Sequence, residues 1–211
     1  AGLVGADGPT HAGSFDTTYL TTLPNFIVMA ASDESELVKM INTSTDINDR
    51  PCAFRYPRGT GIGSILPSIN EKIEIGKSRV IKEGKKLAIL NFGARLNETL
   101  KAAENLIKKG ITITVIDARF AKPLDENLIW QLATTHEAIM TIEEGSIGGF
   151  GSHVVDFLTK KGLMDSNLKF RSLTLPDIFI DQDTPDKMYK IAHLDSCLLY
   201  TSDAADDTSG V

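Results

Sequence analysis

The stretch Leu87-Ala88-Ile89-Leu90-Asn91-Phe92-Gly93, together with the residues that follow it as far as Ile116, decides the fold. Its first four residues form an apolar run that predicts a buried strand, and Asn91-Phe92-Gly93 is predicted to turn out of that strand. Residues 96–109 predict a helix, because their apolar side chains recur on one face. Gly110 fits a left-handed helix cap, and Ile111–Ile116 predicts the next strand.

Similar elements follow toward the C-terminus. In chain order we expect a helix over Asp125–Ala133, a strand over Ala138–Ile142, a helix that opens near Gly151, a strand over Phe170–Leu175 and a helix over Thr184–Ala192. Repeated strand–helix–strand units with short connections imply a mostly parallel sheet that is covered on both faces. The sequence therefore predicts a doubly wound α/β domain of about 120 residues.

Shorter elements precede this domain. Phe15–Leu20 and the residues after Ser32-Asp33 predict helices, while Phe26–Met29 and Ala53–Tyr56 predict strands. Residues 59–75 hold Gly, Pro, Ser and Asn with little periodicity, so we place a domain boundary there.

Composition excludes several classes of function. The formal net charge is −6, and the basic residues are scattered, which argues against nucleic-acid binding. No apolar run approaches the ~20 residues that a membrane helix needs. Two cysteines in 211 residues fit a reducing compartment, so we expect a cytoplasmic protein, and a plastid location also stays open.

The segment from Gly5 to Asp16, Gly-Ala-Asp-Gly-Pro-Thr-His-Ala-Gly-Ser-Phe-Asp, has the residue types of a ligand-binding loop. It is a tight Gly/Pro turn that presents Asp7, Thr10 and His11 just before a helix. Such a loop can bring backbone N–H groups and an imidazole to an anionic or carbonyl ligand. From spacing alone, His11 could equally be a surface residue in a turn.

This segment resembles the pyrimidine-domain signature of the transketolase superfamily. Gly13, Phe15-Asp16 and Tyr19-Leu20 make it more similar to the deoxyxylulose-phosphate synthases than to transketolase, which has Gln-Pro after the histidine. The resemblance continues through Leu23-Pro24-Asn25 and Ser32-Asp33-Glu34. It implies that His11 and Asp7 are catalytic residues that line the substrate pocket, and that His11 also contacts the substrate.

A second segment, Arg55-Tyr56-Pro57-Arg58-Gly59, follows a predicted strand. An arginine at a strand end can fork two N–H donors onto phosphate oxygens, although a solvated arginine at a turn has the same pattern. The synthases carry Tyr-Pro-Arg-Gly here. The resemblance therefore implies that Arg58 binds the phosphate of glyceraldehyde 3-phosphate, whereas Arg55 is interpreted as structural.

Other motifs are interpreted as structural. Glu143–Gly151 lacks the spacing of a nucleotide-binding glycine loop, and the two adjacent glutamates point in opposite directions on a strand. The resemblance assigns this turn to packing and subunit contact, and it matches the segment Asp117–Asp125 to the family's C-terminal domain, in which no catalytic group is assigned. His136, His153 and His193 have no metal-ligand spacing, so no metal site is predicted.

The resemblance also predicts the domain organisation. Residues 1–70 correspond to the C-terminal part of a pyrimidine-binding domain, and residues 71–196 correspond to a transketolase C-terminal domain with a doubly wound, mostly parallel sheet. Residues 197–211 lack periodicity and are interpreted as a non-native or disordered tail. Because the chain opens on Ala1 without an initiator methionine, we expect it to begin inside a longer protein.

The resemblance implies thiamine diphosphate and Mg²⁺ as cofactors of the complete enzyme. The Gly-Asp-Gly…Asn motif that holds them, and the glutamate that activates the pyrimidine, do not occur in these residues, so no cofactor-binding residue is assigned and the chain alone is expected to be inactive. The implied substrates are pyruvate and glyceraldehyde 3-phosphate, and the implied assembly is a homodimer. The alternatives are a transketolase, the β subunit of a 2-oxoacid dehydrogenase, and a non-catalytic assembly module.

Overall fold

The computed structural model describes residues 1–195, which form a five-stranded and a three-stranded β-sheet. In the large sheet all neighbouring strands are parallel except the pair at one edge, where β3 runs antiparallel to β5. The three central strands are buried along their whole length, as expected for parallel strands that are covered on both faces. The order is β3 (Arg79–Lys82), β5 (Ile113–Asp117), β4 (Leu87–Phe92), β7 (Ala138–Glu143) and β8 (Lys169–Leu173).

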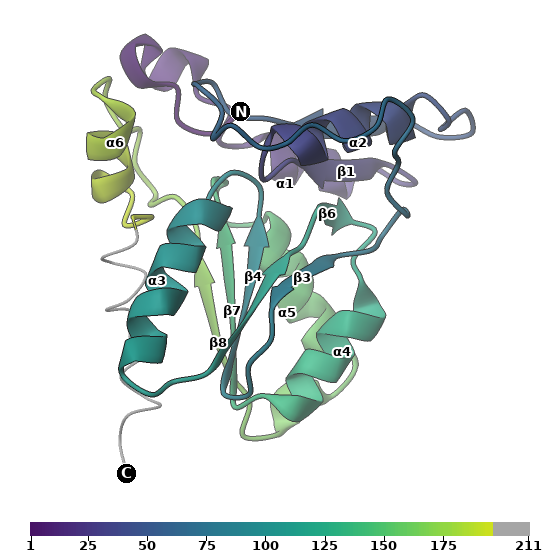
Figure 1. Cartoon of the computed structure of the whole chain (residues 1–211), viewed down its shortest axis with the longest axis vertical. Coiled ribbons are helices and arrows are strands. Elements are labelled where there is room, and N and C mark those ends of the chain that lie inside the picture. Colours follow the sequence, from purple (N-terminus) through teal and green to yellow (C-terminus); the bar gives the residue numbers. More distant parts are fainter. Residues whose placement is uncertain (196–211) are drawn as a thin grey trace.

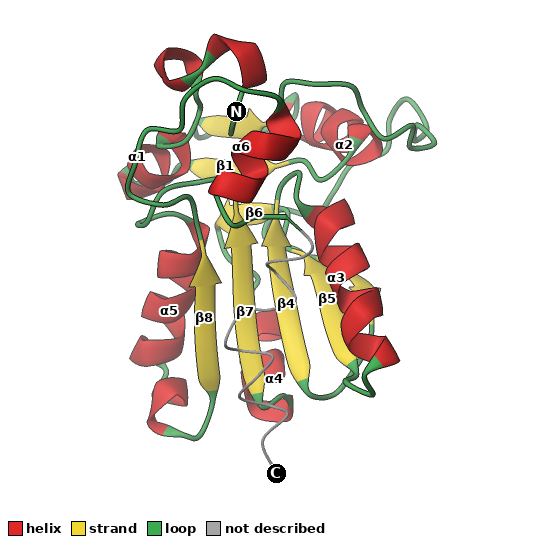
Figure 2. Cartoon of the chain, turned by 90° about the vertical axis from the view of Figure 1, so that its left-hand side faces the viewer, coloured by secondary structure: helices red, strands yellow, loops and turns green. Residues whose placement is uncertain are grey.

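Helices cover both faces of the large sheet (Figure 2). On one face, Leu106 of α3 and Met188 of α6 belong to one apolar cluster with Ile89. On the other face, Ile129 of α4 and Val154 of α5 pack in a second cluster. The bounds are α3 (Leu96–Lys108), α4 (Glu126–Thr135), α5 (Phe150–Lys160) and α6 (Pro185–Ile191), with a 3₁₀ turn η3 (Leu163–Asp165) after α5. We call residues 78–195 the large-sheet unit.

The small sheet is built mainly from the N-terminal part of the chain. Its central strand β1 (Ile27–Ala30) pairs in parallel with β2 (Cys52–Arg55) and antiparallel with β6 (Phe120–Lys122). Helix α1 (Asp16–Thr22) precedes β1, and α2 (Glu34–Ser44) connects β1 to β2. Because β6 follows β5 closely along the chain, the large-sheet unit contributes one strand to the small sheet.

The small sheet lies across the carboxyl ends of the large-sheet strands (Figure 1). The arrowheads of β4, β7 and β8 all point toward it in Figure 2. Ligands of open α/β sheets commonly bind outside the carboxyl ends of the strands. The junction between the two sheets is therefore the place to look for a functional site.

The predicted α/β class and the doubly wound, mostly parallel sheet are confirmed. The predicted turn at Asn91-Phe92-Gly93 is wrong at its first two residues, which continue β4. The Asn91 side chain is buried, but it donates to Gly93 O (2.7 Å) and accepts from Thr99 Oγ1 (3.3 Å), so a polar residue can end this buried strand. Strands β3 and β6 were not predicted.

Two further expectations concern the C-terminal tail and membrane-spanning helices. The predicted tail, 197–211, lies outside the described residues. Among the helices in residues 1–195, none combines the length and the apolar character that a bilayer crossing requires.

Candidate functional site

The candidate site is built on a loop of residues 1–16, which we call the site loop. Its base is closed by two backbone hydrogen bonds between Gly2 and Gly13, with N···O distances of 2.9 and 3.0 Å. Between them the chain makes two short 3₁₀ turns, η1 (Gly5–Asp7) and η2 (Pro9–His11). The proline fixes the first position of η2, as at the start of a helix. The tip of the loop therefore carries Asp7 and His11.

The structure brings Asp7 and Arg58 together. The Arg58 guanidinium forms an ion pair with the Asp7 carboxylate, and both side chains remain partly exposed to solvent, at 56% and 39%. His11 lies on the same loop with an exposed side chain, and its Nδ1 is 2.9 Å from Thr10 Oγ1. Two of the three predicted site residues are thus in contact, and the third lies four residues from Asp7 on the same loop.

An open cleft runs beside this ion pair. Its volume is about 450 Å³, which falls in the range of small-molecule sites. The cleft lies between α1 and the end of β2, which stops at Arg55, and Arg58 lines it from the loop that follows the strand. It is lined by Ala1, Asp16, Tyr19, Leu20, Ala53, Phe54, Arg55, Tyr56, Pro57 and Arg58.

Arg55 differs from Arg58 in its surroundings. Its side chain is 6% exposed, and it hydrogen-bonds to the site loop, to the start of α1 and to the end of β7. These contacts agree with the interpretation of Arg55 as a structural residue.

The glycine-rich turn after β7 is filled by a side chain of the protein itself. The buried Glu143 carboxylate accepts the N–H groups of Phe150 (3.0 Å) and Gly151 (2.9 Å) at the start of α5. Burial raises the pKa of Glu143, although these two hydrogen bonds oppose the shift. An internal carboxylate therefore occupies the donors that a phosphate would need. The interpretation of this turn as packing agrees with the geometry.

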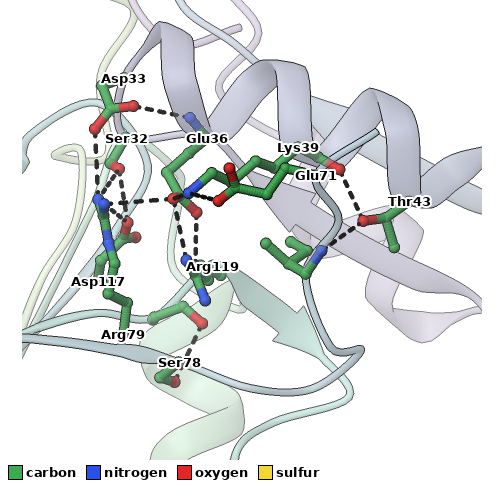
Figure 3. Close-up of polar contacts among 12 residues, drawn as sticks. Ser32, Asp33, Glu36, Lys39, Thr43, Glu71, Ser78, Arg79, Asp117 and Arg119 are labelled. Carbon is green, nitrogen blue, oxygen red and sulfur yellow. Dashed lines mark hydrogen bonds and ion pairs between the residues drawn. The ribbon is translucent and has the colours of Figure 1, made fainter. Parts of the chain in front are cut away.

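A buried charged cluster at the junction of the two sheets was missed by the sequence reasoning (Figure 3). Arg119 forks onto Glu36, with Nε to Oε2 at 2.6 Å and Nη2 to Oε1 at 3.0 Å. Arg79 Nη2 lies 3.0 Å from Asp117 Oδ2, which also accepts from Ser32 Oγ at 2.7 Å. Asp117 directly follows a predicted strand and Glu36 lies near a predicted helix start, but Arg79 and Arg119 lie outside the predicted elements.

Burial and pairing act in opposite directions within this cluster. Burial raises the pKa of Glu36, but Arg119, Arg79 and Lys39 outweigh it, so the pKa lies below its ordinary value. Burial also raises the pKa of Asp117, to about 6, and there the hydrogen bond from Ser32 and the charge of Arg79 do not compensate. The cluster joins α2 to β3 and to the end of β5, and it therefore ties the small sheet to the large-sheet unit.

The residues present do not fit a thiamine diphosphate–Mg²⁺ centre by themselves. Within residues 1–195, no three His, Cys, Asp or Glu side chains are grouped so that they could hold a metal ion. The acidic side chains that do gather, Glu36 and Asp117, are neutralised by Arg79 and Arg119. His136 Nε2 is 2.7 Å from Thr114 Oγ1 and far from the site loop in the chain.

Comparison with known proteins places both parts of the chain. The family model for the transketolase C-terminal domain matches residues 76–198, and the model for the transketolase pyrimidine-binding domain matches residues 1–61. A solved structure described as "Split gene transketolase, inactive beta4 tetramer" is similar, with a TM-score of 0.80 and 26% sequence identity. That match covers 94% of this chain and 62% of that chain.

A crystal structure of transketolase from Campylobacter jejuni subsp. jejuni NCTC 11168 shares the fold, with a TM-score of 0.69 and 18% identity. The match covers 93% of this chain and 28% of that one. This chain therefore spans less than two thirds of the length of either relative.

Proposed function

This chain belongs to the transketolase family of thiamine-diphosphate-dependent enzymes, and on that premise we propose that it forms part of a 1-deoxy-D-xylulose-5-phosphate synthase. The reaction joins pyruvate to D-glyceraldehyde 3-phosphate and yields 1-deoxy-D-xylulose 5-phosphate and CO₂. Thiamine diphosphate supplies the decarboxylation and carbon–carbon bond chemistry when bound. The residues of this chain would bind and orient the phosphorylated aldehyde.

One observation supports this proposal more than any other: Arg58 meets Asp7 at the mouth of the cleft. A half-exposed guanidinium can fork onto phosphate oxygens, because its N–H donors are planar and always charged. In the proposal, the substrate phosphate displaces part of the Asp7–Arg58 ion pair. His11, on the same loop, would donate to or accept from the aldehyde oxygen. Fixing the aldehyde in this way lowers the entropic part of the barrier.

The first test is the change Arg58→Ala in the complete enzyme that carries these residues. Loss of a charged hydrogen bond to phosphate costs roughly 1.5–3 kcal/mol. We therefore expect kcat/KM for glyceraldehyde 3-phosphate to fall roughly 10- to 150-fold. With D-glyceraldehyde, which has no phosphate, kcat/KM should change less than about twofold, since no phosphate bond is lost.

Arg50→Ala is the matched control, because Arg50 is an exposed arginine that pairs only with its neighbour Asp49 among the described residues. It should leave both aldehydes unaffected. If kcat/KM falls equally for the two aldehydes in the Arg58 variant, Arg58 does not bind the phosphate, and the assignment is wrong.

We also propose that this chain acts together with a further protein segment that supplies the cofactor centre. Three facts support the idea: no metal-binding group is present in residues 1–195, the family relatives are longer, and a similar transketolase structure is described as inactive. The chain alone would then show no turnover.

The partner we propose for assembly is a second copy of the chain. Phe15, Tyr19 and Leu23 are 47%, 59% and 46% exposed; Tyr19 lies in α1, and Phe15 and Leu23 are the residues that cap its two ends. Phe179, 71% exposed, packs edge-on against Phe15. Contiguous exposed aromatic side chains are typical of protein–protein contacts. The relative described as a tetramer of β chains supports self-association.

A further inference from the structure

Arg55 connects three parts of the chain that lie around the site loop. Its Nε donates to Asp16 Oδ2 at 2.6 Å, at the start of α1. Its Nη2 donates to Gly13 O at 2.8 Å, in the base of the site loop, and to Glu144 O at 3.0 Å, after the end of β7. A planar guanidinium can hold several acceptors in one fixed arrangement, whereas a lysine ammonium cannot reproduce it.

Glu144 holds the other strand of the loop base. An added Cβ on Gly2 would lie 1.8 Å from Glu144 Oε2, so a side chain at this position would overlap the carboxylate. Gly2 also has a φ of +72°, in the left-handed region that favours glycine. The two segments of the loop base therefore both depend on Glu144. Gly2 packs against its carboxylate, and Gly13 is linked to its backbone oxygen through Arg55.

Glu144 is itself fixed by the large-sheet unit. Its Oε1 lies 3.2 Å from Arg95 Nε, and the Arg95 guanidinium stacks 3.6 Å from the centre of the Tyr189 ring. Arg95 caps α3 and Tyr189 lies in α6, so Glu144 is joined to both elements through an ion pair, in which Arg95 Nε and Glu144 Oε1 make no hydrogen bond. The Glu144 side chain is only 5% exposed, so water has little access to its contact with Arg95.

Other contacts place the rest of the site loop on the same unit. Ser146 N donates to Ser14 O at 2.8 Å. An added Cβ on Gly8 would lie 3.1 Å from Gln182, and one on Gly5 would lie 3.6 Å from Pro185. Figure 1 shows the loop beside α6. The tip that carries Asp7 therefore rests on residues that come more than one hundred positions later in the sequence.

We propose that Arg55 is a positioning residue, which holds the base of the site loop against the end of β7 so that Asp7 meets Arg58. Glu144 is the second member of this anchor. Arg55 touches neither Asp7 nor Arg58; it acts through Gly13, Asp16 and the strand that leads to Arg58. The role of the large-sheet unit is then to set the geometry of a loop that belongs to the other domain. The catalytic meaning of the anchor rests on the proposed function, but the anchor itself does not.

The test is hydrogen exchange of single amides in this chain, with Arg55→Lys. The amides of Gly13 and Ser146 form the hydrogen bonds at the loop base, so they report its closure. We expect their exchange to become at least about tenfold faster, because a lysine ammonium cannot reproduce the three contacts of the guanidinium. Amides in the β4–β7 ladder, at Ile89 and Met140, should keep their rates within about twofold.

Two more variants make the result decisive. Asp16→Asn removes the carboxylate that orients Arg55 and should open the same amides, which keeps the test valid if the lysine variant folds poorly. Arg50→Lys, on the exposed surface, should change none of them. Uniform acceleration of loop and ladder amides would mean that Arg55 serves only general stability, and unchanged loop amides would mean that it anchors nothing. Either result overturns the proposal.

A kinetic measurement separates this proposal from the proposed function. In the complete enzyme, Arg55→Lys should raise KM for glyceraldehyde 3-phosphate at least about fivefold and leave KM for pyruvate unchanged. If the loop amides open but neither KM moves, the anchor stands and the assignment of the loop to the aldehyde site falls. If KM for the aldehyde rises while the amides stay protected, the anchor is wrong.

Discussion

At Asp117, burial raises the pKa of the side chain, while a hydrogen bond and neighbouring positive charges lower it. Its side chain is fully buried at the end of β5 and faces Ser32, Arg79, Glu36 and Arg119. Oδ2 is hydrogen-bonded, but Oδ1 is buried with no hydrogen-bond partner in the described part of the chain. Burial therefore raises the pKa from 3.8 to about 6. The folded state therefore binds the proton of the Asp117 carboxyl group more tightly than the unfolded state does.

This raised pKa predicts a pH-dependent stability. The contribution of Asp117 is fully present below pH 4 and is lost as the pH rises through about 6, since only the unfolded state then ionises freely. Asp117→Asn removes this dependence. The free energy of unfolding of the variant, minus that of the wild type, should increase by about 2 kcal/mol between pH 4.5 and pH 7.

Urea denaturation at the two pH values measures this difference, and subtracting the two proteins cancels the contributions of shared groups that do not interact with Asp117, such as Glu143. Glu36, whose pKa is lowered, loses its contribution only as the pH falls below about 4.5. A difference between the proteins that stays constant with pH would show that Asp117 is ionised throughout, held by Arg79.

For single residues, the sequence predicts their chemistry better than it predicts which residues lie next to them in space. Asp7, His11 and Arg58 could be selected from their motifs, and their roles remain predictions. The contact between Asp7 and Arg58 could not be derived from the sequence, because it depends on how Gly2, Gly13 and Arg55 close the loop base. The Glu36–Arg119 and Asp117–Arg79 pairs join segments far apart in sequence, and nothing local marks such partners.

Helix α1 and the residues that cap it carry exposed apolar side chains beside the site. Tyr19 is exposed within α1, and the exposed residues Phe15 and Leu23 cap its two ends; we call these three residues the apolar stripe. Since Tyr19 also lines the cleft, a partner that covers this stripe would shield the cleft from water. Assembly and the site are therefore expected to be linked through α1.

The double change Tyr19→Asp and Leu23→Asp tests this link. We expect it to weaken self-association of the chain by at least about tenfold, because two apolar side chains in the proposed contact become charged. Analytical ultracentrifugation over a concentration series measures the change. Trp130→Asp is the control: Trp130 is 52% exposed on α4, away from the stripe in the chain, and should leave association unchanged. Equal association of all three proteins would exclude α1 from the contact.

The elements that the sequence predicted well are those with strong apolar periodicity, such as α3, and those with long apolar runs, such as β7. Strand β3, Arg79–Lys82, escaped because it is an edge strand of only four residues with charged ends. Strand β6, Phe120–Lys122, is shorter still, and its pairing with β1 exists only once the two sheets have come together. Such strands are determined by tertiary packing rather than by local pattern.

The whole molecule combines two separate sheets, and the large-sheet unit contributes β6 to the small one. The site loop and Arg58 belong to the part that matches the pyrimidine-binding domain, while Glu144, Arg95 and Tyr189 belong to the part that matches the C-terminal domain. The charged cluster around Asp117 and the anchor at Arg55 both cross between these parts. The contacts that hold the site loop against the residues after β7 come from both parts, so we expect the two parts to act as one unit.

The measurement that tests the central claim most directly is the reaction catalysed by the complete enzyme that carries these residues. It would be supplied with carboxyl-labelled pyruvate and glyceraldehyde 3-phosphate, with this chain alone as the control. We predict that labelled CO₂ and 1-deoxy-D-xylulose 5-phosphate form in equal amounts, and that the chain alone forms neither. Transfer of a two-carbon unit from a ketose phosphate, with no CO₂ released from pyruvate, would contradict the synthase assignment and make the protein a transketolase.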